Sequence, residues 1–425
     1  MADYRVAAEV RLWNERVGVV AEDADGMVVF EYDPAWIARG LEISPRHLPL
    51  ARRGPVAFPA LRRIESFQGL PGVLADALPD RFGNAVIKAY FARAGRPDEA
   101  LSPVQRLLYV GRRAMGALEF EPALALPVTP AVEEALEVQR LVAEARQVVS
   151  GNVAVALPEI MQLGASAGGA RPKAVILWDE TRGTVRSGFA APTAGETPSI
   201  VKFDGVGELA HPDPAPQPYN RIEYAYSRMA RAAGIETAEV RLLEERRLAH
   251  LLSRRFDRIG TARLHLHSLG GLDHADYDAP GTYSYEQYLQ VILDLGLPPA
   301  AVDEGYRRAV FNVLAANQDD HVKNFAFLMD PAGRWQLSPA YDVTYAHGSG
   351  YTRRHQLSLN GKREAITRDD LQALAARYGV KGNGRPIIAQ VVDALGGWAG
   401  FAKEAGVPKE RTAQIGAEIK GRSGG

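Results

Sequence analysis

The chain has 425 residues, of which 46% are apolar, and a formal net charge of −1. This length exceeds the size at which a single hydrophobic core usually stops growing, so we expect two or three domains. The balanced charge excludes a global basic field for unspecific nucleic-acid binding, and the absence of cysteine excludes disulfides, thiolate catalysis and cysteine-based zinc sites. There is neither a run of about 18 apolar residues nor an N-terminal signal pattern, so we expect a soluble, cytoplasmic protein without a membrane partner.

The first hundred residues have the pattern of a small β-rich module with some helix. Residues 4–33 alternate apolar and polar side chains as strands do. A helix is predicted from Pro79 to about Arg93, since proline is tolerated in a first helical turn. The proline-interrupted stretch 122–130 predicts a boundary, which ends a first domain at residues 1–125 and precedes a helix from Ala135 to Val149.

The remainder changes from strand-rich to helix-rich. Up to about residue 257 the pattern predicts strands at 173–178, 199–203 and 250–253 and a helix at 220–233. After Ser284 it predicts helices at 284–296, 302–316, 367–378 and 386–404, and a frayed end. This order is that of the two lobes of a protein kinase. We therefore expect an α+β, bilobed kinase-like fold with a nucleotide-binding N-lobe at 126–257 and an all-helical C-lobe at 258–425, and ATP between the two lobes.

A glycine-rich loop precedes the first predicted strand of this N-lobe. Three glycines in residues 164–169 would let backbone N–H groups approach an anion closely. The loop matches neither Gly-x-x-x-x-Gly-Lys-Ser/Thr nor Gly-x-Gly-x-x-Gly, so a flexible connector is an equally good interpretation. Its position before a strand, and upstream of a lysine inside another strand, favours phosphate binding.

That lysine is Lys202, in the apolar run Ser-Ile-Val-Lys-Phe. An unpaired ammonium is costly in such a strand, so we expect Lys202 to hold ATP phosphates, although a strand-edge lysine that points to water is the alternative. Glu223 has two interpretations of equal weight. It could pair with Lys202, or it could complete a capping box that begins at Asn220.

The most informative stretch is Asn317-Gln-Asp-Asp-His-Val-Lys-Asn324. In kinases a catalytic-loop aspartate orients the acceptor hydroxyl, an asparagine five residues later binds Mg²⁺, and a further aspartate completes the metal site. Asp319, Asn324 and Asp342 stand in this order. Each residue alone could be a cap or turn residue, but the joint arrangement predicts a phosphotransferase centre. The spacing excludes Asp320, which we take as a control position.

The segment between Asn324 and Asp342 has the pattern of a β-hairpin. Phe325 and Phe327 alternate with smaller residues, and residues 330–333 are a turn signal. A hairpin brings its open ends together, so we expect Asn324 to lie near the residues just before Asp342.

Taken together, these motifs resemble the HipA family of serine/threonine kinase toxins of type II toxin–antitoxin systems. The segments that carry the likeness are Ser166-Ala-Gly-Gly-Ala-Arg-Pro-Lys173, Ile200-Val-Lys-Phe203, Arg255-Phe-Asp-Arg258, Asp319-Asp-His-Val-Lys-Asn324 and Leu337-Ser-Pro-Ala-Tyr-Asp-Val343. Gly69-Leu-Pro-Gly72, Leu78-Pro-Asp-Arg-Phe-Gly-Asn84 and Gly116-Ala-Leu-Glu-Phe120 extend it over nearly the whole chain. One departure is Arg171-Pro172, since proline removes a backbone donor from the loop.

The resemblance implies roles for individual residues, with ATP and Mg²⁺ as cofactors. Asp319 is the catalytic base, Asn324 and Asp342 bind the metal, and Ser166 is the autophosphorylation position. The implied ATP-binding residues are Gly168, Gly169, Ala170, Lys202, Arg254, Phe256, His321 and Lys323. Ser166 could instead be an ordinary polar loop residue.

The resemblance also implies a function and partners. These are phosphorylation of a protein substrate, such as an aminoacyl-tRNA synthetase or another translation component, self-inhibition through the loop serine, and a HipB-like helix-turn-helix antitoxin that links the chain to operator DNA. Two alternatives remain open at this point. The chain could be a small-molecule or lipid kinase on the same fold, or a catalytically silent scaffold for antitoxin and DNA.

Overall fold

The computed structural model describes residues 4–79, 83–84, 87, 101–122, 173–188, 190–205, 217–245 and 247–423. The helix predicted at 135–149 and the glycine-rich loop lie outside these residues, as does most of the helix predicted at 79–93. No helix in the described ranges is both long and apolar enough to cross a membrane.

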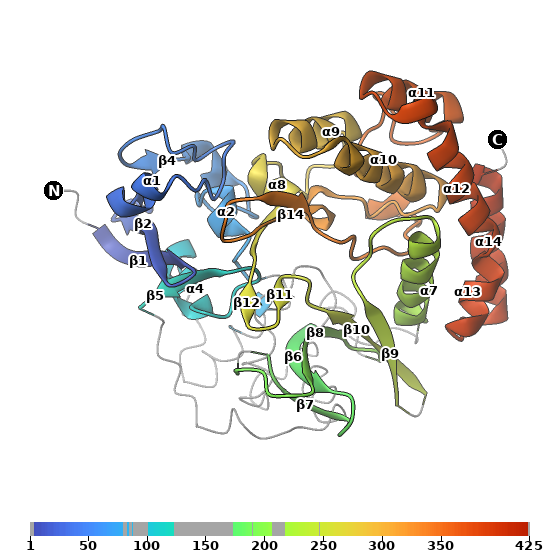
Figure 1. The fold of residues 1–425 in the computed structure, drawn as a ribbon, viewed down its shortest axis with the longest axis horizontal. Coiled ribbons are helices and arrows are strands. Elements are labelled where there is room, and N and C mark those ends of the chain that lie inside the picture. Colours follow the sequence, from blue (N-terminus) through green and yellow to red (C-terminus); the bar gives the residue numbers. More distant parts are fainter. Residues whose placement is uncertain are drawn as a thin grey trace.

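An N-terminal module, residues 4–122, is built on a five-stranded antiparallel sheet with the order β4-β3-β2-β1-β5 (Figure 1). The strands are β1 (Tyr4–Leu12), β2 (Glu15–Asp23), β3 (Val28–Tyr32), β4 (Val56–Ala57) and β5 (Leu118–Glu121). The helices are α1 (Pro34–Arg39), η1 (Pro59–Arg63), α2 (Gly72–Ala75) and α4 (Pro103–Val110). Alternate residues of β1 and most of β2 are buried in the core of the module, to which Met329 of the C-lobe also belongs.

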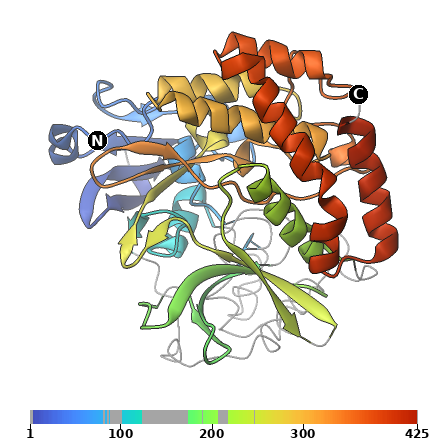
Figure 2. The same cartoon turned by 45° about the vertical axis from the view of Figure 1, so that its right-hand side comes forward.

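The N-lobe is a second five-stranded sheet, in the order β7-β6-β8-β10-β9, with one long helix. Its elements are β6 (Lys173–Asp179), β7 (Thr184–Ser187), β8 (Glu196–Lys202), α7 (Tyr219–Ala232), β9 (Val240–Glu245) and β10 (Leu248–Arg254). Helix α7 contacts β9 and β10 on one side and α12 and α13 of the C-lobe on the other, so it joins the two lobes (Figure 2).

The C-lobe contains most of the helices and the largest core. Its helices are α8 (Leu269–Leu272), α9 (Tyr285–Asp294), α10 (Pro299–Leu314), η4 (Val322–Asn324), η5 (Tyr351–Arg353), α11 (Arg368–Arg377), η6 (Lys381–Gly384), α12 (Arg385–Gly396), α13 (Trp398–Glu404) and α14 (Lys409–Ser423). Its strands are β11 (Arg258–Ile259), β12 (Ala262–Arg263), β13 (His265–Ser268), β14 (Ala326–Met329) and β15 (Trp335–Leu337).

Three details of the C-lobe differ from the sequence-based expectation. The lobe is mainly but not all helical, because β13, β14 and β15 form a three-stranded sheet. The stretch 386–404 contains two helices that meet at Gly397, since a glycine pair lowers the stability of a continuous helix. The end of the chain is not frayed up to Ser423, because Ile415 and Ile419 of α14 are buried in the C-lobe core.

The N-terminal module docks on the C-lobe through polar and apolar groups, since Met329 of β14 is buried in the core of the module and Trp335 of β15 packs against that core. Asp76 pairs with Nδ1 of His267 at 2.7 Å and accepts hydrogen bonds from the amide and hydroxyl of Ser268, at 2.7 and 2.6 Å. The amide of Gly72 donates to Nε2 of His274 at 3.0 Å. The module is therefore held by residues that follow the N-lobe in the sequence.

A buried carboxylate, Asp257, ties the same module to the connection between the lobes. Asp257 is 0% exposed, accepts two hydrogen bonds from Arg255 and one from Arg258, and accepts another from the amide of Gly116 at 2.7 Å. Burial alone would raise the pKa of Asp257, but the charges of Arg255 and Arg258 outweigh it and lower this pKa to about 2.

This geometry predicts the pH dependence of the Asp257→Asn variant. Because the pKa of Asp257 is lower in the folded protein than in the unfolded chain, ionised Asp257 stabilises the fold above about pH 4. This contribution to the free energy of unfolding is lost as the pH falls toward 2. We expect the variant to be about 3 kcal/mol less stable at pH 7, since two arginines lose their counter-charge. About 2 kcal/mol of that gap should disappear between pH 4 and pH 2.

Urea unfolding of both proteins at pH 7, 5 and 3 measures this gap. The exposed Asp393 provides a matched control, and Asp393→Asn should change the free energy of unfolding by less than about 0.5 kcal/mol throughout. A wild-type advantage that stayed constant from pH 7 to pH 3 would contradict the ionic role of Asp257.

Candidate active site

Lys202, the last residue of β8, lies between two carboxylates from distant parts of the chain. Its Nζ is 2.5 Å from Oε1 of Glu223 on α7 and 2.6 Å from Oδ1 of Asp342 in the C-lobe. The lysine is only 9% exposed, so the strand-edge alternative is wrong. The capping-box alternative for Glu223 is also wrong, because Asn220 donates to the carbonyls of Lys202 and Ala249 and does not cap α7.

The charges of this triad stabilise one another. Burial would lower the pKa of Lys202, but the charges of Asp342 and Glu223 raise it above its ordinary value. Burial would raise the pKa of Asp342, and the charge of Lys202, followed by that of Lys173, lowers it to about 2. Both Lys202 and Asp342 are therefore ionised at neutral pH.

Lys173 is a residue that the sequence analysis did not assign to the site. It begins β6, is 5% exposed and stands directly opposite Lys202 in the β6–β8 ladder. Like charges at directly opposed positions destabilise a sheet unless anions compensate them. Two neighbouring buried lysines thus make this end of the sheet suited to a polyanion, and the signal available in the sequence was a lysine directly after the glycine-rich loop.

The hairpin predicted between Asn324 and Asp342 is confirmed. Strands β14 and β15 pair antiparallel, with Phe327 opposite Leu337. The hydroxyl of Tyr341 donates to the carbonyl of Lys323 at 2.5 Å, which joins the two ends. Asp342 itself has φ 53°, in the left-handed region that residues other than glycine rarely adopt, and such strain is concentrated at functional sites.

Asp319 and Asn324 lie on the other side of the same region. The side-chain amide of Asn324 donates to the carbonyl of Asp319 at 2.7 Å, which closes the five-residue loop. The Asp319 side chain is 38% exposed, with Oδ1 3.8 Å from Nε2 of His321. Asn324 and Asp342 line one small cavity with Asp320 and Tyr341. The structure thus brings Lys202, Glu223, Asp342, Asn324 and Asp319 into one region.

The other predicted site residues have different surroundings. Phe256 packs against Tyr341 with a ring-centroid distance of 5.6 Å, so it lies beside Asp342. Arg254 is exposed and its guanidinium is 3.4 Å from Glu239. Lys323 places its ammonium 4.5 Å from the ring centre of Tyr277. Gly168, Gly169, Ala170 and Ser166 lie outside the described residues.

The donor set fits a magnesium ion that also binds phosphates. Because the NH₂ group of Asn324 is used by Asp319, its carbonyl oxygen is the atom left to ligate, and Asp342 adds a carboxylate. Magnesium prefers such hard oxygen ligands and commonly takes only one or two from the protein.

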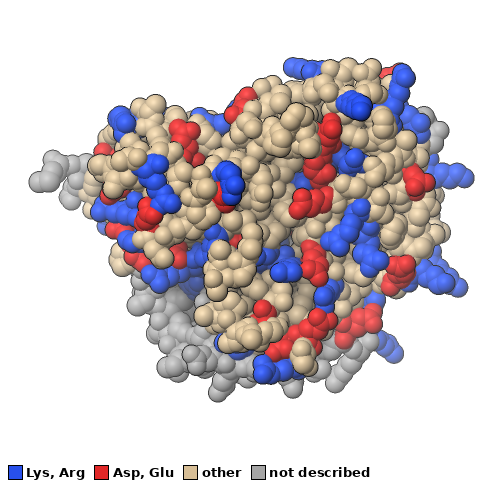
Figure 3. Space-filling view, in the orientation of Figure 1, with Lys and Arg blue, Asp and Glu red and all other residues tan. Residues whose placement is uncertain are grey.

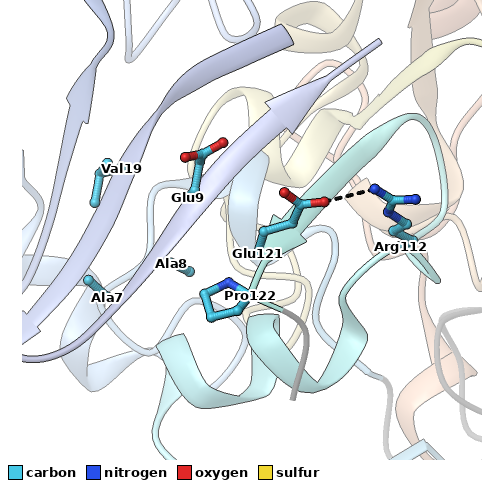
Figure 4. A pocket seen from close by; sticks show the side chains of 7 residues that line it. All are labelled: Ala7, Ala8, Glu9, Val19, Arg112, Glu121 and Pro122. Carbon is cyan, nitrogen blue, oxygen red and sulfur yellow. Dashed lines mark hydrogen bonds and ion pairs between the residues drawn. The ribbon is translucent and has the colours of Figure 1, made fainter. Parts of the chain in front are cut away.

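A second hollow lies far from these residues, on the N-terminal module. It is lined by Ala7, Ala8, Glu9, Val19, Arg112, Glu121 and Pro122 (Figure 4). Its polar groups are surface groups such as the Arg112–Glu121 pair, at 2.9 Å, and it has no buried cation or strained carboxylate. On the face shown in Figure 3, basic and acidic side chains are interspersed over the described surface without a field of one sign. The buried charges therefore identify the region around Lys202 as the candidate active site.

Comparisons with known proteins show what this chain is similar to in sequence and in fold. The chain is 27% identical over 398 residues to a protein of Sinorhizobium fredii named "Putative kinase Y4dM". The aligned region covers 87% of this chain and 85% of that relative. The fold of this chain matches HipA from a Shewanella oneidensis complex of HipA, HipB and operator DNA, with a TM-score of 0.69 and 19% sequence identity. The match covers 98% of this chain and 96% of the chain in that structure. The Helicobacter pylori kinase CtkA gives a TM-score of 0.34 at 14% identity over 60% of this chain and 93% of CtkA.

Two family descriptions match the sequence. Residues 8–121 match the HipA N-terminal domain, and residues 165–419 match the HipA-like C-terminal domain. Together they cover the N-terminal module and both lobes of a bilobed, kinase-like α+β fold. The chain therefore belongs to the HipA family.

Proposed function

We propose that this chain is an ATP-dependent serine/threonine protein kinase of the toxin type. The observation that carries the proposal is Lys202, whose ammonium lies between Glu223 and Asp342 within 2.6 Å of each. A kinase needs a strand lysine that is paired with a helix glutamate and lies next to a metal-binding aspartate. A catalytically silent scaffold has no need of a buried, strained and mutually dependent set of charges.

The residues of the chain have separable tasks in this proposal. Lys202 and Lys173 attract the phosphates of ATP, and Glu223 keeps Lys202 oriented. Asp319 accepts the proton of the acceptor hydroxyl while the hydroxyl oxygen bonds to the γ-phosphorus. The bond between this phosphorus and the bridging oxygen breaks, and ADP leaves with that oxygen. Asn324 and Asp342 would hold Mg²⁺, which neutralises charge on the phosphates when it is bound.

The finer parts of the proposal extend from the family. We infer that the acceptor is a protein hydroxyl, with a translation component such as an aminoacyl-tRNA synthetase as the substrate class. The partner is a HipB-like helix-turn-helix antitoxin, supported by the Shewanella complex that contains HipA, HipB and operator DNA. Contact with DNA would be made through that partner.

The Asp319→Asn variant tests the chemistry. It should fold normally and bind Mg·ATP like the wild type, while transfer of radiolabelled γ-phosphate falls by about 10²- to 10⁴-fold, because the general base is lost. Asp342→Ala and Lys202→Ala are the contrasting variants, since each should weaken nucleotide binding itself. Undiminished transfer by a folded Asp319→Asn protein would rule out this residue as the base.

Ser166 supports a proposal about regulation. A phosphate on its hydroxyl would add about −1.5 to −2 charges at neutral pH in the glycine-rich segment that precedes Lys173 in the sequence, and we expect it to compete with the phosphates of ATP. We expect autophosphorylated protein to be inactive. Mass spectrometry after incubation with Mg·ATP, together with the activity of the same sample, checks this. Full activity at stoichiometric Ser166 phosphorylation would show that the serine does not control the kinase.

A further inference from the structure

Asp320, which the spacing rule excludes from catalysis, has one of the most completely satisfied carboxylates in the described part of the chain. It is 1% exposed. Its Oδ2 accepts from the hydroxyl of Tyr285 at 2.6 Å and lies 2.8 Å from Nδ1 of His355, and its Oδ1 accepts from the amide of Gln356 at 2.7 Å. All three partners are themselves buried, so this contact is part of the interior and not a chance pairing at the surface.

The partners of Asp320 belong to two separate parts of the C-lobe. Tyr285 begins α9, deep in the C-lobe core. His355 and Gln356 belong to what we name the acceptor-side segment, residues 343–358, which follows Asp342 directly. A single carboxylate therefore connects the catalytic loop both to the rigid helical core and to this segment.

Backbone hydrogen bonds extend this connection along the loop. The amide of Gln318 donates to the carbonyl of Ala346 at 3.0 Å, and the amide of Ala346 donates to the carbonyl of Ala316 at 3.1 Å. The side-chain amide of Gln356 donates to the carbonyl of Gln318 at 3.1 Å. The catalytic loop and the acceptor-side segment are thus joined at Asp320 itself and at residues 316 and 318, which precede it.

The acceptor-side segment also borders the catalytic carboxylate. Tyr351 is 42% exposed, and its hydroxyl donates to the carbonyl of Tyr277 at 2.6 Å. Burial of its ring and the charge of the nearby Asp319 raise the pKa of Tyr351 above its ordinary value.

We propose that Asp320 is a positioning residue, which orients Asp319 by joining the catalytic loop to Tyr285 and to the acceptor-side segment. The inference rests on the proposed function, because it assigns Asp320 a role in the same phosphoryl transfer. The two aspartates are adjacent, so any rotation of the buried residue moves the backbone of the exposed one. A displacement of about 1 Å at a reacting group can cost about a hundredfold in rate.

The isosteric variant Asp320→Asn is the direct test. The side-chain oxygen of the introduced asparagine can still accept from the backbone amide of Gln356. Its NH₂ group, however, then faces the Tyr285 hydroxyl and the ring nitrogen of His355. These two groups therefore lose the carboxylate oxygen that accepts from them in the wild type. We expect the rate constant for loss of γ-phosphate from ATP, to water or to the protein, to fall by about ten- to a hundredfold per nucleotide-binding site. The KM for Mg·ATP should change less than about twofold, since Lys202 and Asp342 are untouched. A purely structural residue would lower the number of active molecules and leave kcat per site unaltered.

Tyr285→Phe is a milder variant, and it can test the same role of Asp320 if Asp320→Asn folds poorly. It removes one hydroxyl from the carboxylate, and kcat should fall by about fivefold at constant KM. Its matched control is Tyr306→Phe, because Tyr306 is equally buried and its hydroxyl has no hydrogen-bond partner among the described residues. Asp370→Asn is the control for the carboxylate, as Asp370 is 4% exposed and its partners, in the α11 cap and at Asn360 and Lys362, do not include the catalytic loop. Both controls should keep kcat per site.

Hydrogen exchange supplies a readout that does not depend on activity. Asp320→Asn should speed amide exchange in residues 316–320 and 346–356, and Asp370→Asn should speed it only near α11 and residues 360–362, where its partners lie. Unchanged kcat in Asp320→Asn, or unchanged exchange in both segments, would overturn the positioning role. If the wild type itself released no γ-phosphate, the proposed function would fail, and the exchange data would still decide whether Asp320 holds the loop.

Discussion

The arrangement of the two lobes depends on one buried ammonium group. Lys202 has 9% of its surface exposed, and an isolated charge at that depth costs several kcal/mol, so its two carboxylates must stay in place. One comes from α7 and the other from the loop after the β14–β15 hairpin. The pairing therefore fixes the sheet, the helix and the C-lobe loop relative to one another. In the function proposed for this chain, the phosphates of ATP would therefore meet charges that are already oriented.

The same reasoning separates two adjacent residues of identical chemistry. Asp319 is 38% exposed at its side chain, whereas Asp320 is almost fully buried and accepts from three partners. An exposed carboxylate can exchange protons with an incoming hydroxyl. A buried carboxylate surrounded by donors can only hold its neighbours. Environment, and not residue type, divides the roles of this pair.

Sequence patterns predicted what is local and missed what is tertiary. The hairpin and most helices of the C-lobe follow from alternation and periodicity. The pairing of Glu223 with Lys202 could be stated only as one of two alternatives, because nothing local shows which way α7 faces. Asp320 was set aside, since its partners Tyr285 and His355 are about 35 residues away in either direction. Lys173 was overlooked because cross-strand register cannot be read from one strand.

Helix α14 and the small C-lobe sheet show a second limit of the sequence patterns. Only Ile415 and Ile419 of α14 are buried, and Gly416 and Gly421 lower its helix propensity, so packing on the C-lobe, and not intrinsic preference, stabilises it. Strand β13 pairs with β14 across some sixty residues of intervening chain, a contact with no short-range signal.

The docking of the N-terminal module on residues 257–276 has a consequence for synthesis. The module is complete once its last strand, β5, has been made, yet Asp257, His267, Ser268 and His274 are translated only after the entire N-lobe. At about 5–20 residues per second the ribosome needs on the order of ten seconds for that interval. During this time Asp76 and the Gly72 and Gly116 amides face water, which hydrates them well. The polar part of this docking surface can wait in water without attracting neighbouring chains, whereas the apolar contacts with Met329 and Trp335 form only after β14 and β15 have been made.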